Sequence, residues 1–333
     1  MLERPVLVAP DSFKGTFRAA EVAGAIGRGL ERAGLMPPDL CPLADGGEGT
    51  MEALLLALGG EVAGVEVEDP LGRPVQAQFG LVEDGGTAVV EMASASGLGL
   101  VAEGERDAWA ASTYGTGELI CAAVDAGAQV VLVGVGGSAT TDGGAGAIEA
   151  IDAHGGLGGA RMVVLSDVRT PFERAPAVYG PQKGADRDMV KRLEERLDAL
   201  AARLPRDPRG IPMTGAAGGL SGGLWAAFGA ALEPGAQFIL DALEFDARMR
   251  AARAVVTGEG KLDEQTLEGK LVGEIGTRTR QAGVPLHAIV GTDRLDLFGK
   301  RIIDLQVVQE ATTLQEIEAA GETLGEGLLV GRW

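Results

Sequence analysis

Short apolar runs alternate with amphipathic segments along much of the chain. The first run, residues 6–9, predicts a buried strand, and the amphipathic segment at 19–33 predicts a helix after it. Further buried strands are predicted at 130–135, 162–166, 254–257, 285–290 and 302–308, and helices at 48–58, 117–126, 143–153, 271–282 and 313–328. Alternation of this kind is typical of βαβ units around a parallel sheet.

Residues 62–93 follow a different pattern. Apolar and polar positions alternate or pair at 65–68, 75–79 and 88–90, and turn residues (Gly, Pro, Asp) separate these segments. This pattern predicts β-hairpins. A second change of composition covers 187–209, a charged helix that ends in a Pro-rich connector, before a Gly-rich stretch at 215–223.

The length of 333 residues suggests two domains, at about 100–200 residues per domain. We therefore predict an α/β protein of two α/β domains. A Rossmann-like parallel-sheet domain would be interrupted by a smaller mixed-sheet domain with β-hairpins, with an active-site cleft between them. The first domain would comprise residues 1–62, 105–160 and 251–333, and the inserted one 63–104 and 161–250.

Composition excludes several classes of partner and site. Lys plus Arg number 29 against 48 Asp plus Glu, and a net charge of −19 disfavours nucleic acid and anionic membranes as partners. Cys41 and Cys121 form no CxxC pair, and we see no signal-peptide or membrane-span pattern, so we expect a cytoplasmic monomer or homodimer acting on small molecules. The only histidines, His154 and His287, are too few for a multi-His metal site, and we expect both to be structural.

Gly-rich segments that carry a carboxylate, and often a lysine or hydroxyl, recur after the predicted strands. They lie at 9–16, 43–50, 134–146, 166–170, 179–184 and 257–263. Glycine allows backbone N–H groups to converge on an anion, and open α/β sheets bind ligands at the carboxyl ends of their strands. Of the six lysines, five adjoin a glycine, an arrangement that can deliver an ammonium group to a phosphate oxygen.

Known nucleotide motifs narrow the choice only partly. Neither a P-loop nor the H-R-D loop of protein kinases occurs. Residues 134–139 match G-x-G-x-x-[GA] after a predicted strand, so a nicotinamide-dependent oxidoreductase is a possible alternative. The lack of a convincing His or Tyr-x-x-x-Lys proton relay argues against it.

Ten motifs spread over nearly the whole chain carry a specific resemblance. They are APDSFKGT (9–16), ADGGEGT (44–50), DPLGRPV (69–75), EMASASGL (91–98), STYGTGELI (112–120), VGGSATTDGGAG (135–146), SDVRTPF (166–172), YGPQKGA (179–185), GAAGGLSGGL (215–224) and TGEGKLDEQTLEGK (257–270). In this order they resemble the glycerate kinase family, which phosphorylates D-glycerate from ATP. The resemblance implies ATP with Mg²⁺ and 2-phosphoglycerate as the expected product. A 3-phosphoglycerate product, a kinase for another small hydroxy acid, and a sensor that only binds glycerate are the alternatives.

Phosphoryl transfer needs positioning and charge neutralisation, and the residues were assigned roles accordingly. The predicted catalytic residues are Lys14, Asp45, Asp142 and Asp167, with Asp142 and Asp167 also predicted to ligate Mg²⁺. Ser12, Lys183 and Arg73 are predicted to bind the substrate, and Gly136, Gly137, Ser138, Thr140, Glu259, Lys261 and Asp263 the nucleotide. Each has a structural alternative: an Asp before Gly can form an Asx turn or cap a helix, and a turn lysine can be merely solvated. Which carboxylate would act as the base stays open.

Overall fold

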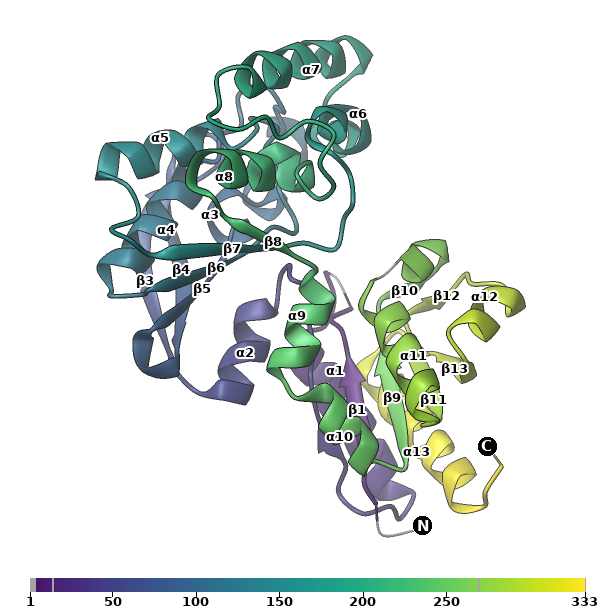
Figure 1. Cartoon of the computed structure of the whole chain (residues 1–333). Coiled ribbons are helices and arrows are strands. Elements are labelled where there is room, and N and C mark those ends of the chain that lie inside the picture. The colour runs from purple at the N-terminus through teal and green to yellow at the C-terminus, as the bar shows by residue number, and fades with distance from the viewer. Residues whose placement is uncertain (1–3, 14, 269, 333) are drawn as a thin grey trace. The chain divides into compact units, whose positions relative to one another are not determined.

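The structure, a computed structural model, describes residues 4–13, 15–268 and 270–332. The chain forms two compact units: unit 1 comprises Met1–Asp45 and Ala236–Trp333, and unit 2 comprises Gly46–Gly235. Each unit contains its own sheet (Figure 1). The predicted α/β class is confirmed, with a parallel main sheet in one unit and a mixed sheet in the other.

Unit 1 is built on a five-stranded sheet in the order β13-β11-β9-β1-β2, and all its neighbours pair in parallel. The strands are β1 (Val6–Pro10), β2 (Asp39–Leu40), β9 (Ala254–Gly258), β11 (Leu286–Val290) and β13 (Leu305–Glu310). A second, two-stranded parallel ladder joins β10 (Lys261–Leu262) to β12 (Thr292–Asp293). The helices are α1 (Ala19–Arg32), α9 (Gly235–Ala242), α10 (Phe245–Ala251), α11 (Leu271–Ala282), α12 (Leu297–Ile302) and α13 (Leu314–Leu329).

Helices α1 and α13 cover one face of this sheet. The stripe of Val22, Ile26 and Leu30 on α1 is buried with apolar side chains of α13 and the strands. The two helices approach closely at Gly29, where a Cβ atom would lie 2.1 Å from the carbonyl oxygen of Glu318. A larger residue at position 29 would therefore force the helices apart.

Unit 2 is built on a six-stranded sheet in the order β3-β4-β5-β6-β7-β8. The strands are β3 (Glu61–Glu68), β4 (Pro74–Val82), β5 (Thr87–Glu91), β6 (Val130–Gly134), β7 (Arg161–Leu165) and β8 (Ala231–Glu233). The pairs from β3 to β5 are antiparallel, which confirms the predicted hairpins, and the pairs from β5 to β8 are parallel. The helices are α2 (Thr50–Leu58), α3 (Ala93–Ser96), α4 (Tyr114–Asp125), α5 (Ala145–His154), α6 (Ala175–Tyr179), α7 (Arg187–Ala201) and α8 (Leu220–Phe228).

Opposite faces of this second sheet bury different helices. Phe79 and Leu81 of β4 join the main core with α4 and α5, whereas a Cβ atom on Gly80 between them would touch Met51 and Leu55 of α2. Because successive strand residues face opposite sides, α2 covers the face opposite α4 and α5.

The compact units have other boundaries than the predicted domains. Residues 105–160 were expected in the Rossmann-like domain, but β6 pairs with β5 and β7 and so belongs to the sheet of the hairpins. Residues 46–62 also lie in unit 2, and 236–250 in unit 1, which makes the inserted unit the larger one. Periodicity identifies a strand but not its neighbours, and the boundaries depend on the neighbours. The strand expected at 302–308 begins later, at Leu305, because residue 302 ends α12.

Candidate active site

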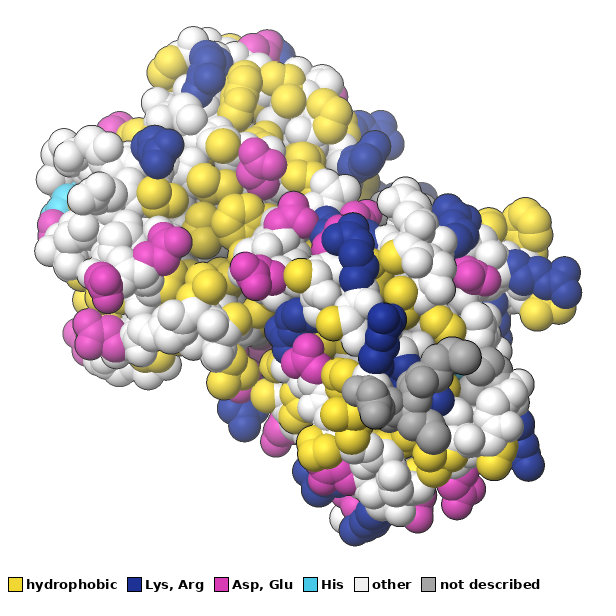
Figure 2. Space-filling model, turned by 60° about the horizontal axis from the view of Figure 1, so that its bottom comes forward, with side chains coloured by type: hydrophobic (Ala, Val, Ile, Leu, Met, Phe, Trp, Pro, Cys, Tyr) yellow, Lys and Arg dark blue, Asp and Glu magenta, His cyan; other side chains and the backbone are white. Residues whose placement is uncertain are grey.

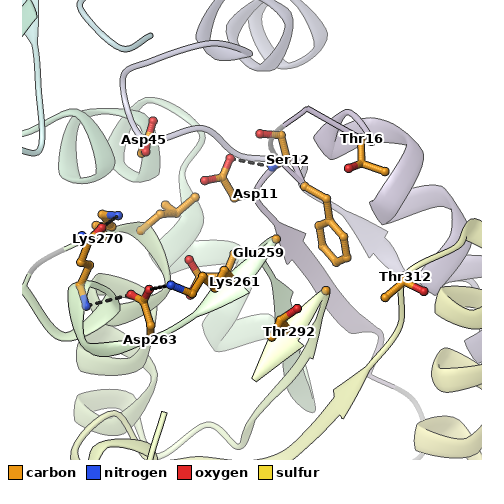
Figure 3. A pocket seen from close by; sticks show the side chains of 15 residues that line it. Asp11, Ser12, Thr16, Asp45, Glu259, Lys261, Asp263, Lys270, Thr292 and Thr312 are labelled. Carbon is orange, nitrogen blue, oxygen red and sulfur yellow. Dashed lines mark hydrogen bonds and ion pairs between the residues drawn. The ribbon is translucent and has the colours of Figure 1, made fainter. Parts of the chain in front are cut away.

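The parallel sheet of unit 1 changes winding direction between two neighbouring strands. From β1 the chain passes through α1 to β2 on one side, whereas β9, β11 and β13 extend the sheet on the other. Ligands of open α/β sheets bind at such a switch point, outside the carboxyl ends of the strands. A pocket of about 500 Å³ opens there (Figure 3).

Within the described part of the chain, six charged side chains line this pocket. They are Asp11 after β1, Asp45, Glu259 after β9, Lys261 on β10, Asp263, and Lys270 at the start of α11. Uncharged hydrogen-bonding side chains also line it: Ser12, Thr16, Gln265, Thr292 and Thr312. The pocket therefore offers carboxylates, ammonium groups and hydroxyls to one ligand.

Two of the carboxylates are held by neighbouring donors. The main-chain N–H of Ser12 donates to Asp11 Oδ1 at 2.6 Å, and Asp11 is only 6% exposed. Thr266 Oγ1 donates to Glu259 Oε1 at 2.8 Å. Such bonds fix the remaining carboxylate oxygens in direction, as a site for a cation or a proton requires.

Asp263 is paired with a lysine. Lys261 Nζ lies 2.7 Å from Asp263 Oδ2, and the hydrogen bond from this lysine lowers the pKa of Asp263. Figure 3 shows both side chains on the same side of the pocket, with Asp11 and Asp45 across from them. The lysine is mostly exposed, so we expect the pair itself to contribute little stability.

The structure brings five of the predicted site residues together in this pocket: Ser12, Asp45, Glu259, Lys261 and Asp263. Lys14 lies outside the described residues. Six further described residues line the pocket without a role predicted from the sequence: Asp11, Thr16, Gln265, Lys270, Thr292 and Thr312. For the first four, the signal was present, because they lie within the motifs at 9–16 and 257–270.

The other predicted residues lie in unit 2. There, both carboxylate oxygens of Asp142 accept hydrogen bonds. Its Oδ2 accepts hydrogen bonds from the N–H of Thr113 (2.9 Å), the hydroxyl of Thr113 (2.8 Å) and the N–H of Gly146 (3.1 Å). Its Oδ1 accepts from the N–H of Gly144 at 3.0 Å, and the side chain is 1% exposed. The carboxylate thus satisfies N–H groups at the start of α5.

Lys183 is buried. It is 1% exposed, and its Nζ donates to Ser138 Oγ at 2.8 Å and to the carbonyl oxygen of Thr140. Burial lowers the pKa of this lysine to about 7, although the nearby Asp142 carboxylate opposes the shift. Lys183 therefore ties the turn at 181–183 to the loop after β6.

The loop with Gly136, Gly137, Ser138 and Thr140 follows β6, as predicted. Its main chain bonds to a neighbouring segment: Leu98 N donates to Gly137 O at 2.8 Å. A dinucleotide fingerprint would direct free N–H groups of the next helix at a pyrophosphate. Because Asp142 already accepts from those of Gly144 and Gly146, the oxidoreductase reading loses its main support.

Arg73 forms ion pairs with two neighbouring carboxylates. Its Nε lies 2.6 Å from Asp69 Oδ2, and its Nη1 lies 3.3 Å from Glu105 Oε2. Asp167 follows the end of β7 and is half-buried.

The histidines lie outside the pocket, as expected of structural residues. His154 pairs with Asp125 at 3.0 Å on the surface. His287 is fully buried on β11, and burial lowers its pKa to about 4.

Comparison with known proteins identifies the family. The model of the glycerate kinase family matches residues 6–155 and 152–324. The chain belongs to the glycerate kinase family. Family membership makes it an ATP-dependent kinase whose acceptor is glycerate, as predicted, with a nucleotide and a small acid as its ligands.

Individual glycerate kinases are similar over most of their length. A glycerate kinase of Halalkalibacterium halodurans is 40% identical over 325 residues, which cover 86% of this chain and 85% of the relative. A glycerate 2-kinase of Escherichia coli K12 is 35% identical over 354 residues, covering 93% and 92%. A crystal structure from Salmonella typhimurium LT2, provisionally assigned as glycerate kinase 2, has a TM-score of 0.82 at 34% identity and covers 99% of both chains.

Two surface properties bear on partners. None of the helices within the described ranges has the length and apolarity that crossing a bilayer requires. On the face shown in Figure 2, acidic and basic side chains are interspersed rather than gathered in one patch.

Proposed function

We propose that the pocket of unit 1 is where the γ-phosphoryl group of ATP passes to the 2-hydroxyl of D-glycerate, giving 2-phosphoglycerate and ADP. The observation that carries this proposal is the set of six charged side chains at the switch point of the parallel sheet. Similarity to a glycerate 2-kinase supports the choice of the 2-hydroxyl.

The reaction forms a bond between the glycerate oxygen and the γ-phosphorus, and breaks the bond from that phosphorus to the oxygen bridging to the β-phosphate. The proton of the hydroxyl passes to a carboxylate. We assign this base to Asp45, which lines the pocket and is half-buried. A general base within reach of the hydroxyl contributes about 10²–10⁴-fold to such rates.

The pocket fits a magnesium ion that accompanies the nucleotide. No cluster of three or more ligating side chains is assembled among the described residues. Mg²⁺ at phosphates usually needs only one or two protein carboxylates and keeps several waters. Asp11 and Glu259 would hold it, because their neighbours already orient them. When bound, the ion would neutralise charge that develops on the phosphate oxygens.

We propose mainly structural roles for the predicted residues of unit 2. Asp142 would cap α5, and Lys183 would hold the loop with Ser138 and Thr140. Arg73 would secure its segment through Asp69 and Glu105. Asp167 stays a predicted metal or base residue. A cytoplasmic location and a monomeric or dimeric state also stay predictions.

Phosphorus NMR of the purified protein with ATP, Mg²⁺ and D-glycerate tests the reaction directly. We expect ADP and a new phosphomonoester resonance that splits into a doublet, because C2 of glycerate carries one proton. A triplet would instead show phosphorylation at C3. Intact ATP after overnight incubation, in a sample that passes a folding check, would overturn the proposal. A panel of other small hydroxy acids would then identify the acceptor.

A further inference from the structure

Lys261 and Lys270, the lysines of the pocket that the structure describes, are held in different ways. Lys261 is paired with the carboxylate of Asp263, which neutralises its charge at close range. Lys270 Nζ donates at 2.8 Å to Oε1 of Gln265, which is a neutral amide. This bond fixes the direction of the ammonium group without cancelling its charge, which also acts on the nearby Asp263 carboxylate and helps to lower the pKa of that group.

Gln265 is itself fixed in place. Its main-chain N–H donates to Asp263 Oδ1 at 3.0 Å, at the start of the short helical turn Glu264–Glu268. Its side-chain carbonyl oxygen then accepts the hydrogen bond from Lys270 Nζ. Holding a long lysine side chain in one direction costs conformational entropy, and a prior hydrogen bond lowers that cost when a ligand binds.

Lys270 also stands at an unusual place for a cation. It is the N-cap residue of the 12-residue helix α11, whose first residue, Leu271, lines the pocket. The partial positive charge of a helix N-terminus disfavours a neighbouring cation, whereas a bound anion would be stabilised by both. The arrangement therefore favours an anionic ligand in this part of the pocket.

The volume of the pocket fits ATP better than glycerate. A volume of about 500 Å³ falls in the range of pockets for drug-sized ligands. ATP, with roughly 30 non-hydrogen atoms, is of that size, whereas glycerate has roughly 7. Most of the pocket would remain empty around the acid alone.

On these grounds, and resting on the proposed function, we propose that Lys270 binds the phosphate groups of the nucleotide and that Gln265 positions it. Lys270 would exchange its single amide contact for phosphate oxygens, or share it with them. Gln265 acts through Lys270 and is a positioning residue. An amide at position 265 suits this role better than a carboxylate, because a carboxylate bonded directly to Nζ would form a second ion pair with the lysine besides the interaction with Asp263.

Calorimetric titration tests this proposal without turnover. The ligands are a non-hydrolysable ATP analogue, AMP-PNP, with Mg²⁺, and separately D-glycerate. For Lys270→Met we expect the affinity for AMP-PNP to fall about tenfold or more, the usual size of a lost charge-assisted bond. Gln265→Glu keeps the lysine and the shape of the side chain, and should also weaken AMP-PNP binding. Lys270→Arg should recover part of the loss. The matched control, Lys191→Met, removes an exposed lysine of α7 and should bind like wild type.

The results divide cleanly. Glycerate affinity should stay within about twofold in all four variants. A fall in glycerate affinity with unchanged AMP-PNP binding would overturn the proposal and assign this part of the pocket to the acid. Unchanged AMP-PNP binding in folded Gln265→Glu would remove the positioning role. Failure of the proposed function would show in a different experiment, as wild-type protein that binds AMP-PNP but forms no phosphoglycerate.

Discussion

Two turns with the same sequence, Asp-Gly-Gly, have different surroundings in the two units. Asp142 of the turn at 142–144 is 1% exposed, and both its carboxylate oxygens accept hydrogen bonds from N–H groups near α5. Asp45 of the turn at 45–47 is half-buried and lines the pocket of unit 1. From the sequence alone, both are predicted to be catalytic.

The difference begins with the helix that follows each turn. Gly143 and Gly144 both have positive φ, at 69° and 82°, which folds the chain so that Asp142 reaches N–H groups at the start of α5. After Asp45, helix α2 begins farther on, and the N–H of its residue Met51 donates to Glu91 Oε1 at 2.9 Å. Because Glu91 meets this need at α2, Asp45 is not required as its cap. The role of an aspartate in such a turn therefore depends on whether another side chain already accepts from the N–H groups of the following helix.

Replacing each aspartate by asparagine should separate the roles most strongly. Asp45→Asn should lower kcat by about 10²-fold or more, because the amide cannot accept the proton of the hydroxyl. Its thermal unfolding should stay close to that of wild type. Initial rates with ATP and D-glycerate, and thermal unfolding scans, measure the two quantities.

Asp142→Asn is the matched control, in the second tripeptide of the same sequence. An amide cannot accept all four hydrogen bonds, so the free energy of unfolding should fall by about 3 kcal/mol, while folded protein keeps most of its kcat. A large fall in kcat at normal stability for Asp142→Asn, with Asp45→Asn nearly normal, would reverse our assignment.

Lys183 permits a smaller test, through pH. Its pKa is lowered from 10.5 to about 7 in the folded protein, so between these pH values the unfolded chain binds more protons. The cost of burial is therefore complete below pH 7 and is relieved as pH rises toward 10.5. From pH 7 to pH 9 the free energy of unfolding of wild type should rise by about 2 kcal/mol more than that of Lys183→Met.

Urea unfolding followed by tryptophan fluorescence measures this difference, since Trp109 and Trp225 both lie in unit 2. Comparing the two proteins cancels the titration of groups that they share. Equal pH dependence in both would mean that Lys183 is not buried as an isolated ammonium group, and would weaken its proposed structural role.

The sequence predicts most individual elements well, because buried parallel strands and amphipathic helices have strong local patterns. The strands predicted at 6–9 and 254–257 are found at Val6–Pro10 and Ala254–Gly258, and the helix predicted at 271–282 is confirmed with those bounds. Strand neighbours could not be predicted in the same way, since the parallel pairing of β5 with β6 joins distant segments. Because of that pairing, residues 105–160 belong to unit 2 and not to the predicted Rossmann-like domain.

The candidate site was predictable where a motif carries chemistry beside a strand end, as at 257–270. Burial was not. Lys183 has the sequence of a solvated turn lysine, yet it is buried against Ser138 and Thr140. Gln265 gave no signal alone, because its role follows from contact with Lys270.

Hydrogen-exchange mass spectrometry with MgAMP-PNP tests most directly whether the pocket of unit 1 receives the nucleotide. We predict slower exchange in peptides that cover residues 258–265, next to Asp11 and Lys270 in the pocket lining. Peptides that cover the loop at 136–142 of unit 2 should change less, because the main chain of Gly137 and Ala139 is already bonded to the segment at 96–98. Strong protection at 136–142 with no change at 258–265 would contradict the account.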